Sequence, residues 1–230
     1  MASSLACDTC PVRDRAACSA LSGDERAQLA RIGRHRDVKR GETVMAAGDD
    51  NIACATLISG ALKIASYDSE GTERILSLVH PAGFVGEMFA PIANHDVIAL
   101  SDSRLCVFSR REYEAALTAF PALAGALLRR STEDLFETRS LIDLMGRRSA
   151  DARVAGLTLA FAKAASDSPC HPAQIFDLPL TRGEMAGLLG LTIETVSRQL
   201  SRLEKRGLIK RQGARGIEIL NAPALQSLLV

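Results

Sequence analysis

The chain has 230 residues and a net charge of only +1, from 28 Lys and Arg against 27 Asp and Glu. That length suits two modest domains or one large one, and the few aromatic residues, seven Phe and two Tyr with no Trp, weigh against a stacking platform for single-stranded nucleic acid. No apolar run is as long as a membrane span, and the opening MASSLAC lacks the charged and apolar regions of a signal peptide, so we expect a cytoplasmic protein with no membrane partner.

Residues 1–20 form a short cysteine-rich segment. It contains CDTCPVRDRAAC, in which Cys7, Cys10 and Cys18 follow the spacing Cys-x2-Cys-x7-Cys. The segment has no helical or strand periodicity, and we expect a loop that is organised by what it binds. In a reducing cytosol, clustered cysteines indicate metal or redox chemistry rather than structural disulfides.

Three thiolates leave a tetrahedral site one ligand short. The remaining cysteines of the chain are Cys54, Cys106 and Cys170. In SRLCVFS, strand alternation places Leu105 and Val107 on one face. Cys106 and Phe108 then share the other face, where a lone cysteine is commonly a small core residue. Spacing alone chooses neither the fourth ligand nor the metal, because zinc and iron–sulfur clusters both bind cysteine sulfur.

Residues 21–110 are predicted to form a β domain. Runs rich in strand-forming residues are separated by turn signals, and these runs are 40–50, 55–68, 73–79 and 96–109. Many short strands at close spacing favour an antiparallel roll or barrel over alternating β-α-β units.

Residues 111–147 change to a helical pattern, which a proline interrupts near its start. Leu128, Leu135 and Ile142 recur every seven residues, and Met145 extends the stripe. Such a stripe suits either a core helix or a seam between two copies of the chain. Because the helix connects a β domain to a basic domain, a dimer seam is favoured.

Residues 148–230 are predicted to form a basic helical domain, in which Ser149 caps the first helix. Residues 181–230 hold eight Lys and Arg against four Asp and Glu, whereas residues 1–180 hold 20 against 23. A basic module on a mildly acidic body suggests a polyanionic partner.

A short helix, a tight turn and a second helix follow within this domain. Thr181 and Glu184 fit a capping box, Gly190 supplies the turn, and Thr192 caps the second helix. The apolar residues at helical spacing, expected in the core, are Ile193, Val196, Leu200 and Leu203. The polar residues left facing outward are Glu194, Thr195, Ser197, Arg198, Ser201, Arg202 and Lys205.

This order of elements is typical of a DNA-binding helix–turn–helix. Arg can bond guanine through two hydrogen bonds, Glu can accept from cytosine, and Ser or Thr can reach a base or a phosphate. LIKRQGARGIEIL then alternates around a glycine-containing turn, as a hairpin wing does, and Lys210, Arg211 and Arg215 are candidates for phosphate contacts. We therefore expect double-stranded DNA as the partner.

Taken together, these segments resemble the CRP/FNR superfamily of bacterial transcription regulators. RGETVMAAGDDNIACATLISGALKI and HPAGFVGEM are similar to its effector-domain signatures, and LTRGEMAGLLGLTIETVSRQLSRLEKRGLI is similar to the winged helix–turn–helix of its FNR branch. The resemblance implies an α+β fold. Its parts would be a cysteine-rich segment over 1–20, an antiparallel, cyclic-nucleotide-binding-like β-roll over 21–110, a dimerisation helix over 111–147 and a winged helix–turn–helix over 148–230.

The resemblance also implies a cofactor and a target. Oxygen-sensing FNR proteins hold a [4Fe–4S] cluster with three N-terminal cysteines and one cysteine of the β domain, which corresponds here to Cys106. The spacing of the N-terminal trio resembles the FNR/FnrN type. The FNR branch reads a TTGA-type half-site through a Glu-x-x-Ser-Arg motif, present here as Glu194, Ser197 and Arg198.

The cyclic-AMP branch of the superfamily fits less well. Its pocket uses a Gly-Glu pair, matched by Gly86 and Glu87, and then an Arg-Ser or Arg-Thr pair that binds the phosphate. NHDVIALSDSRLCV has no such pair at the matching place, so a bound phosphate would lack its charge partner. We expect no cyclic AMP and a structural role for Glu87.

The resemblance therefore implies an oxygen-responsive activator that binds palindromic DNA as a homodimer in low oxygen and contacts RNA polymerase. One alternative is a regulator of the same fold with another effector or a structural zinc, and another is a thiol or iron–sulfur oxidoreductase. We expect no enzyme, because no glycine-rich nucleotide loop follows a strand and the four histidines show no ligand spacing.

Overall fold

The computed structural model describes residues 7–147, 149–166, 171–213 and 215–229, so Cys170 lies outside the described residues. The chain divides into two compact units, the first made of Met1–Thr72 and Leu76–Thr138 and the second of Glu73–Ile75 and Arg139–Val230. Within the described ranges, no helix is long and apolar enough to cross a membrane.

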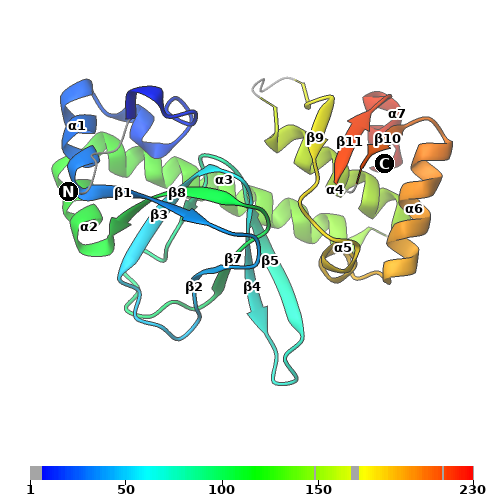
Figure 1. Cartoon of the computed structure of the whole chain (residues 1–230), viewed down its shortest axis with the longest axis horizontal. Coiled ribbons are helices and arrows are strands. Elements are labelled where there is room, and N and C mark those ends of the chain that lie inside the picture. The colour runs from blue at the N-terminus through cyan, green and yellow to red at the C-terminus, as the bar shows by residue number, and fades with distance from the viewer. Residues whose placement is uncertain (1–6, 148, 167–170, 214, 230) are drawn as a thin grey trace. The chain divides into compact units, whose positions relative to one another are not determined.

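The first unit holds the N-terminal turns, the β-roll and most of a long helix (Figure 1). Its elements in chain order are the 3-10 turns η1 (Cys7–Thr9) and η2 (Ala17–Ala20), helix α1 (Gly23–Ile32), strands β1 (Gly33–Val38), β2 (Thr43–Met45), β3 (Ala53–Ser59), β4 (Leu62–Tyr67), β5 (Glu73–Val79), β6 (Phe84–Val85), β7 (Asp96–Ala99) and β8 (Ser103–Ser109), and helices α2 (Arg110–Ala119) and α3 (Pro121–Gly146). Both β5 and α3 contribute residues to both units.

The strands form two four-stranded sheets, in the orders β1-β8-β3-β6 and β2-β7-β4-β5. Strand β8 pairs antiparallel with β1 on one side and β3 on the other. Leu105 and Val107 of β8 are buried with Leu57 and Leu62 in the core of the roll, while Phe108 belongs to a different hydrophobic cluster. The predicted antiparallel roll and the predicted alternation along β8 are both confirmed.

Helix α1 and strand β1 were not predicted, because none of the predicted strand runs covers their residues. Helix α1 begins with a capping box, in which Ser22 Oγ accepts from the Glu25 backbone N–H at 3.3 Å and the Glu25 carboxylate accepts from the Ser22 N–H at 2.8 Å. Strand β1, with the sequence GRHRDV, is an edge strand with mostly polar side chains, so it has no apolar alternation. The predicted run 40–50 is also too long, since only β2 is a strand there.

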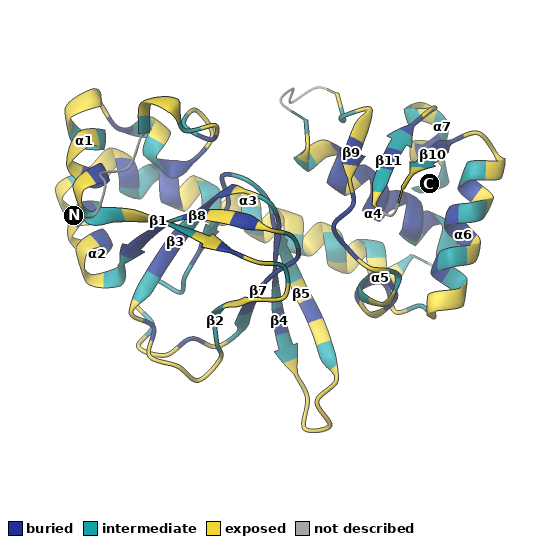
Figure 2. Ribbon diagram, in the orientation of Figure 1, coloured by how far each residue is buried: buried dark blue, intermediate teal, exposed yellow. Residues whose placement is uncertain are grey.

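The second unit contains, in chain order, α4 (Ala150–Ala164), β9 (Ile175–Asp177), α5 (Arg182–Leu189), α6 (Ile193–Lys205), β10 (Ile209–Gln212), β11 (Gly216–Ile219), α7 (Ala222–Gln226) and η3 (Ser227–Leu229). Strands β10, β11 and β9 form a small antiparallel sheet. Helix α4 is buried along most of its length (Figure 2). Its predicted cap is confirmed, because Ser149 Oγ accepts from the Ala152 N–H at 3.2 Å.

Helix α3 buries only its N-terminal turns, where Leu123, Ala126 and Leu127 enter a hydrophobic cluster. Further along, its large apolar side chains are exposed. The predicted seam residues Leu128, Leu135, Ile142 and Met145 have exposed fractions of 70%, 48%, 64% and 40%. The dimer seam remains a prediction for these four residues.

Candidate metal centre and nucleic-acid interface

The cysteine-rich segment is a compact pair of turns rather than the predicted loop. Backbone N–H groups of Cys10 and Arg13 donate to the carbonyls of Cys7 and Cys10, and the Ala16 N–H donates to Val12. Val12 and Ala16 are buried against Ile58 and Ala82 of the β-roll. These two small apolar residues hold the segment on the roll. Two residues are too few to give a helical or strand periodicity in the sequence.

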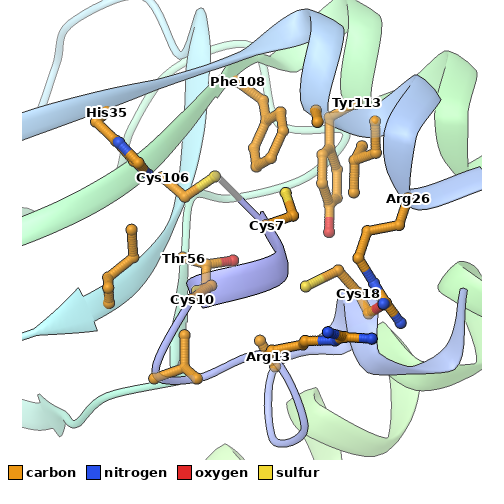
Figure 3. Close-up of a pocket in the computed structure, with 15 residues that line it drawn as sticks. Cys7, Cys10, Arg13, Cys18, Arg26, His35, Thr56, Cys106, Phe108 and Tyr113 are labelled. Carbon is orange, nitrogen blue, oxygen red and sulfur yellow. The ribbon is translucent and has the colours of Figure 1, made fainter. Parts of the chain in front are cut away.

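Cys7, Cys10 and Cys18 of the segment and Cys106 of β8 line a single pocket (Figure 3). Thr56 and Ile58 of β3 and His35 of β1 also line it, because Cys106 pairs across the sheet with both Thr56 and His35. Figure 3 shows the sulfurs of Cys7, Cys18 and Cys106 directed into the space between segment and sheet. The structure therefore brings together the four cysteines predicted as ligands.

The four thiols line the pocket, but they do not converge on one position at which a single metal ion could bind. Among the described residues, no three His, Cys, Asp or Glu side chains are grouped so that they could hold a metal ion. A mononuclear zinc site needs every ligand sulfur about 2.3 Å from one ion. In a [4Fe–4S] cluster each cysteine instead binds its own iron, which demands a wider ring of sulfurs around a shared space. The four sulfur donors and the apolar walls of the pocket are of the kind that both groups use.

Neighbouring thiols of the pocket raise one another's pKa. Burial raises the pKa of Cys106 well above its ordinary value, and the neighbouring Cys7, Cys18 and Cys10 raise it further. Burial likewise raises the pKa of Cys18, with smaller contributions from Cys10 and Cys7. In the absence of a bound cation, burial and these neighbours keep Cys18 and Cys106 as neutral thiols.

Helix α1 adds a positive charge that sequence reasoning missed. The Arg26 guanidinium donates to the carbonyl oxygens of Cys18 at 3.3 Å and Leu21 at 2.8 Å. Its charge opposes the rise in pKa of both Cys7 and Cys18. The start of this helix could have been predicted from the capping-box pattern at Ser22 and Glu25.

Cys54 is not part of this pocket. Cys54 is fully buried in the hydrophobic cluster behind it and does not line the pocket. Burial raises the pKa of Cys54 to about 12, so it remains a neutral thiol. Of the three candidates for a fourth ligand, Cys106 is the one that faces the segment among the residues described, and Cys170 is outside them.

The helix–turn–helix forms as the local sequence predicts. Thr181 and Glu184 make a reciprocal capping box at the start of α5. Gly190 ends α5 with a left-handed backbone, φ 60°, and Thr192 caps α6 by accepting from the Thr195 N–H at 3.2 Å. The Arg153 side chain of α4 donates to the Leu189 carbonyl at 2.9 Å, which fixes the turn between the two helices.

Helix α6 departs from prediction at one apolar position. Val196, Leu200 and Leu203 are fully buried, as expected, but Ile193 is 52% exposed. Ile193 is the first residue of the helix, before the buried stripe begins, so helical spacing alone assigns it wrongly. Gln199 is buried although its side chain is polar.

The polar face of α6 consists of the predicted residues. Glu194, Arg198, Arg202 and Lys205 are exposed, whereas Thr195, Ser197 and Ser201 are half-buried. Arg198 Nη2 donates to Thr195 Oγ1 at 3.3 Å. Hydrogen bonds from its own backbone N–H and from Thr192 lower the pKa of Glu194, so this carboxylate is ionised and accepts hydrogen bonds at neutral pH.

An ion pair ties the wing to α6. Arg211 of β10 donates to the Glu204 carboxylate at 2.6 and 2.8 Å, and its backbone N–H donates to the same carboxylate at 3.0 Å. Of the three cationic residues predicted near phosphates, Arg211 is thus engaged within the domain, while Lys210 and Arg215 are exposed. Sequence spacing gave no sign of the role of Glu204.

Comparison with known proteins agrees with this architecture. Residues 35–119 match a cyclic nucleotide-binding domain and residues 152–228 match a Crp-like helix–turn–helix domain. The chain is 34% identical to the transcriptional activator protein FnrL of Cereibacter sphaeroides, over 92% of this chain and 86% of the relative. The chain belongs to the CRP/FNR superfamily.

Other members of the CRP/FNR superfamily are similar along most of their length. A probable transcriptional activator of Rhizobium leguminosarum bv. viciae is 32% identical over 98% of this chain and 93% of the relative. The structure of FixK2 from Bradyrhizobium japonicum matches with a TM-score of 0.77 and 25% identity, over 86% of this chain and 98% of that one. The matched domains are those of transcription regulators and not of enzymes, so the oxidoreductase alternative is not supported.

Glu87 belongs to the Gly86-Glu87 pair that matches the cyclic-AMP pocket motif of the CRP/FNR superfamily. Its carboxylate accepts from the Asn94 backbone N–H at 3.1 Å and from the Asn94 side-chain amide, and it lies 3.2 Å from His95 Nδ1. Glu87 thus holds its own loop together, which is the structural role that the sequence predicts for it.

Proposed function

We propose that this CRP/FNR protein is an oxygen-responsive transcriptional activator of the cytoplasm. In the proposal, Cys7, Cys10, Cys18 and Cys106 hold a [4Fe–4S] cluster, no cyclic AMP binds, and a homodimer binds palindromic TTGA-type sites in low oxygen and contacts RNA polymerase. The observation that carries it is the convergence of four cysteines, from two distant parts of the chain, on one pocket.

The choice of a cluster over a structural zinc rests on the spacing of the trio Cys7, Cys10 and Cys18, which resembles the FNR/FnrN type. Four cysteine sulfurs from two parts of the chain line the pocket in which we place it. When bound, a [4Fe–4S] cluster links four separated cysteine sulfurs and makes that link sensitive to oxygen. The names of the relatives, which are transcriptional activators, are consistent with a regulator.

A continuous hydrophobic cluster connects the cysteine pocket to α3. Ala17 and Leu21, on either side of Cys18 in the chain, are buried in the same cluster as Leu123 and Leu127 of α3, and Cys106 packs against it. A change in how residues 7–20 are held therefore reaches the start of α3 through direct packing. A shift of a few kcal/mol in a monomer–dimer equilibrium is enough for a switch.

The exposed stripe along α3 is the surface proposed to pair. Leu128, Leu135, Ile142 and Met145 leave a row of apolar side chains in solvent, which a parallel helix of a second copy would cover. A two-fold dimer presents two recognition helices to successive major grooves, and this symmetry calls for a palindromic target.

The seam is tested by Leu135→Glu, which places a carboxylate in the middle of the stripe. Two unpaired charges facing each other across the seam should cost about 3 kcal/mol or more each. Under nitrogen, light scattering should give a dimer mass for the wild type and a monomer mass for Leu135→Glu, with loss of binding to a palindromic duplex. The control is Ile52→Glu, at a residue that is 74% exposed but lies outside α3, and it should remain dimeric. A dimeric Leu135→Glu protein would contradict the proposed seam.

A further inference from the structure

Tyr113 of α2 is a buried residue of the cysteine pocket that the proposed function does not yet use. It lines the pocket together with the four cysteines, and only 2% of it is exposed. Its ring packs against Phe108, with centroids 5.1 Å apart, and against Phe84, at 5.4 Å. Two aromatic neighbours therefore fix the direction in which its hydroxyl points.

The hydroxyl of Tyr113 is directed into the pocket, toward the sulfurs of Cys7 and Cys18 (Figure 3). Among the described residues it makes no hydrogen bond to the protein, and it is not one of the buried polar atoms that lack a partner, so the hydroxyl is open to the pocket. A hydroxyl that opens into a pocket can donate to a group bound there. The phenol is rigidly held and is a hydrogen-bond donor at neutral pH.

The chemistry of the pocket limits what that partner can be. Arg13 and Arg26 carry side-chain donors only, and cannot accept from a phenol. The lining also contains Thr56 and His35, which can accept, and the Cys18 carbonyl, which already accepts from Arg26. The acceptors toward which Figure 3 shows the hydroxyl directed are the sulfurs of Cys7 and Cys18. Hydrogen bonds to cluster sulfurs are one of the main ways in which a protein sets the reduction potential of a cluster.

We propose that Tyr113 donates a hydrogen bond to a sulfur of the cluster or of a cysteine ligand, and so positions and tunes the group that the four cysteines hold. This inference rests on the proposed function. A hydrogen bond to sulfur stabilises the more negative, reduced form, so it raises the midpoint potential and makes the oxidised cluster slower to lose further electrons to oxygen.

The test compares Tyr113→Phe with the wild type, using the other tyrosine of the chain as the control. Tyr67 lies on β4 and is not part of the pocket. Each protein is loaded under nitrogen and titrated with dithionite while its visible absorption is followed. We expect Tyr113→Phe to bind a full complement of iron, to show a more negative midpoint potential, and to bleach faster in air. Tyr67→Phe should match the wild type in all three.

A second measurement separates this role from an ordinary structural hydrogen bond. Thermal unfolding of the iron-free proteins should give Tyr113→Phe a melting temperature equal to or above that of the wild type, because the change removes no hydrogen bond within the protein. A lower melting temperature, or an unchanged midpoint potential, would overturn the inference and leave the cluster itself untouched. If the wild type binds no iron, the proposed function fails and this inference fails with it.

Discussion

Cys106→Ala is expected to purify under nitrogen without iron and to lose oxygen-dependent DNA binding. The variant should fall from about four irons per chain to background, because the proposed cluster loses one of its four cysteine ligands. Far-ultraviolet circular dichroism should stay unchanged, since Cys106 is only half-buried. DNA binding is measured by mobility shift on a palindromic duplex, under nitrogen and after exposure to air.

Cys54→Ala is the matched control for this experiment. Both residues lie in adjacent strands of one sheet and on the same hydrophobic cluster, but Cys54 does not line the pocket. We expect Cys54→Ala to bind iron and to respond to air as the wild type does, with at most a loss of stability from the small cavity. If Cys54→Ala lost its iron and Cys106→Ala kept it, the assignment of the fourth ligand would be wrong.

Arg198→Ala is expected to weaken binding to the preferred palindrome by about 1–3 kcal/mol for each half-site, or about 5- to 150-fold. The loss should be confined to a guanine position, because an exposed Arg in the first turns of α6 can reach the N7 and O6 atoms of guanine. The measurement is a set of dissociation constants for duplexes altered one base pair at a time, at fixed salt.

Arg206→Ala, at the C-terminal cap of the same helix, provides the comparison. It removes the same charge from an exposed position outside the predicted base-reading set. We expect a small and uniform loss across all duplexes, with a shallower salt dependence. A uniform loss for Arg198→Ala as well would make Arg198 a phosphate contact and leave the half-site to be read by other residues.

Local chemistry explains why the DNA-binding module was predictable. Each of its boundaries depends on a side chain within a few residues: the capping box at Thr181 and Glu184, the glycine turn at Gly190 and the cap at Thr192. Periodicity then assigned the buried face of α6 with one error, Ile193, which precedes the buried stripe. The pairing of Glu204 with Arg211 joins two elements and had no local signal.

The cysteine pocket was only partly predictable, because it is a tertiary feature. Spacing identified the trio at Cys7, Cys10 and Cys18, but nothing local connects this segment to Cys106, which lies 88 positions beyond Cys18. Family resemblance supplied that link, and the fold brings the two together. Arg26 and Tyr113 come from helices α1 and α2 that reach the pocket only after folding, so no pattern in the sequence marks them.

The most direct test of the account is a metal and sulfide analysis of wild-type protein purified under nitrogen. We expect a brown protein with broad visible absorption and about four irons and four acid-labile sulfides per chain, whose colour fades in air as its affinity for a palindromic duplex falls. A colourless protein with one zinc, or with no metal at all, whose DNA binding is indifferent to air would contradict the proposed oxygen sensor.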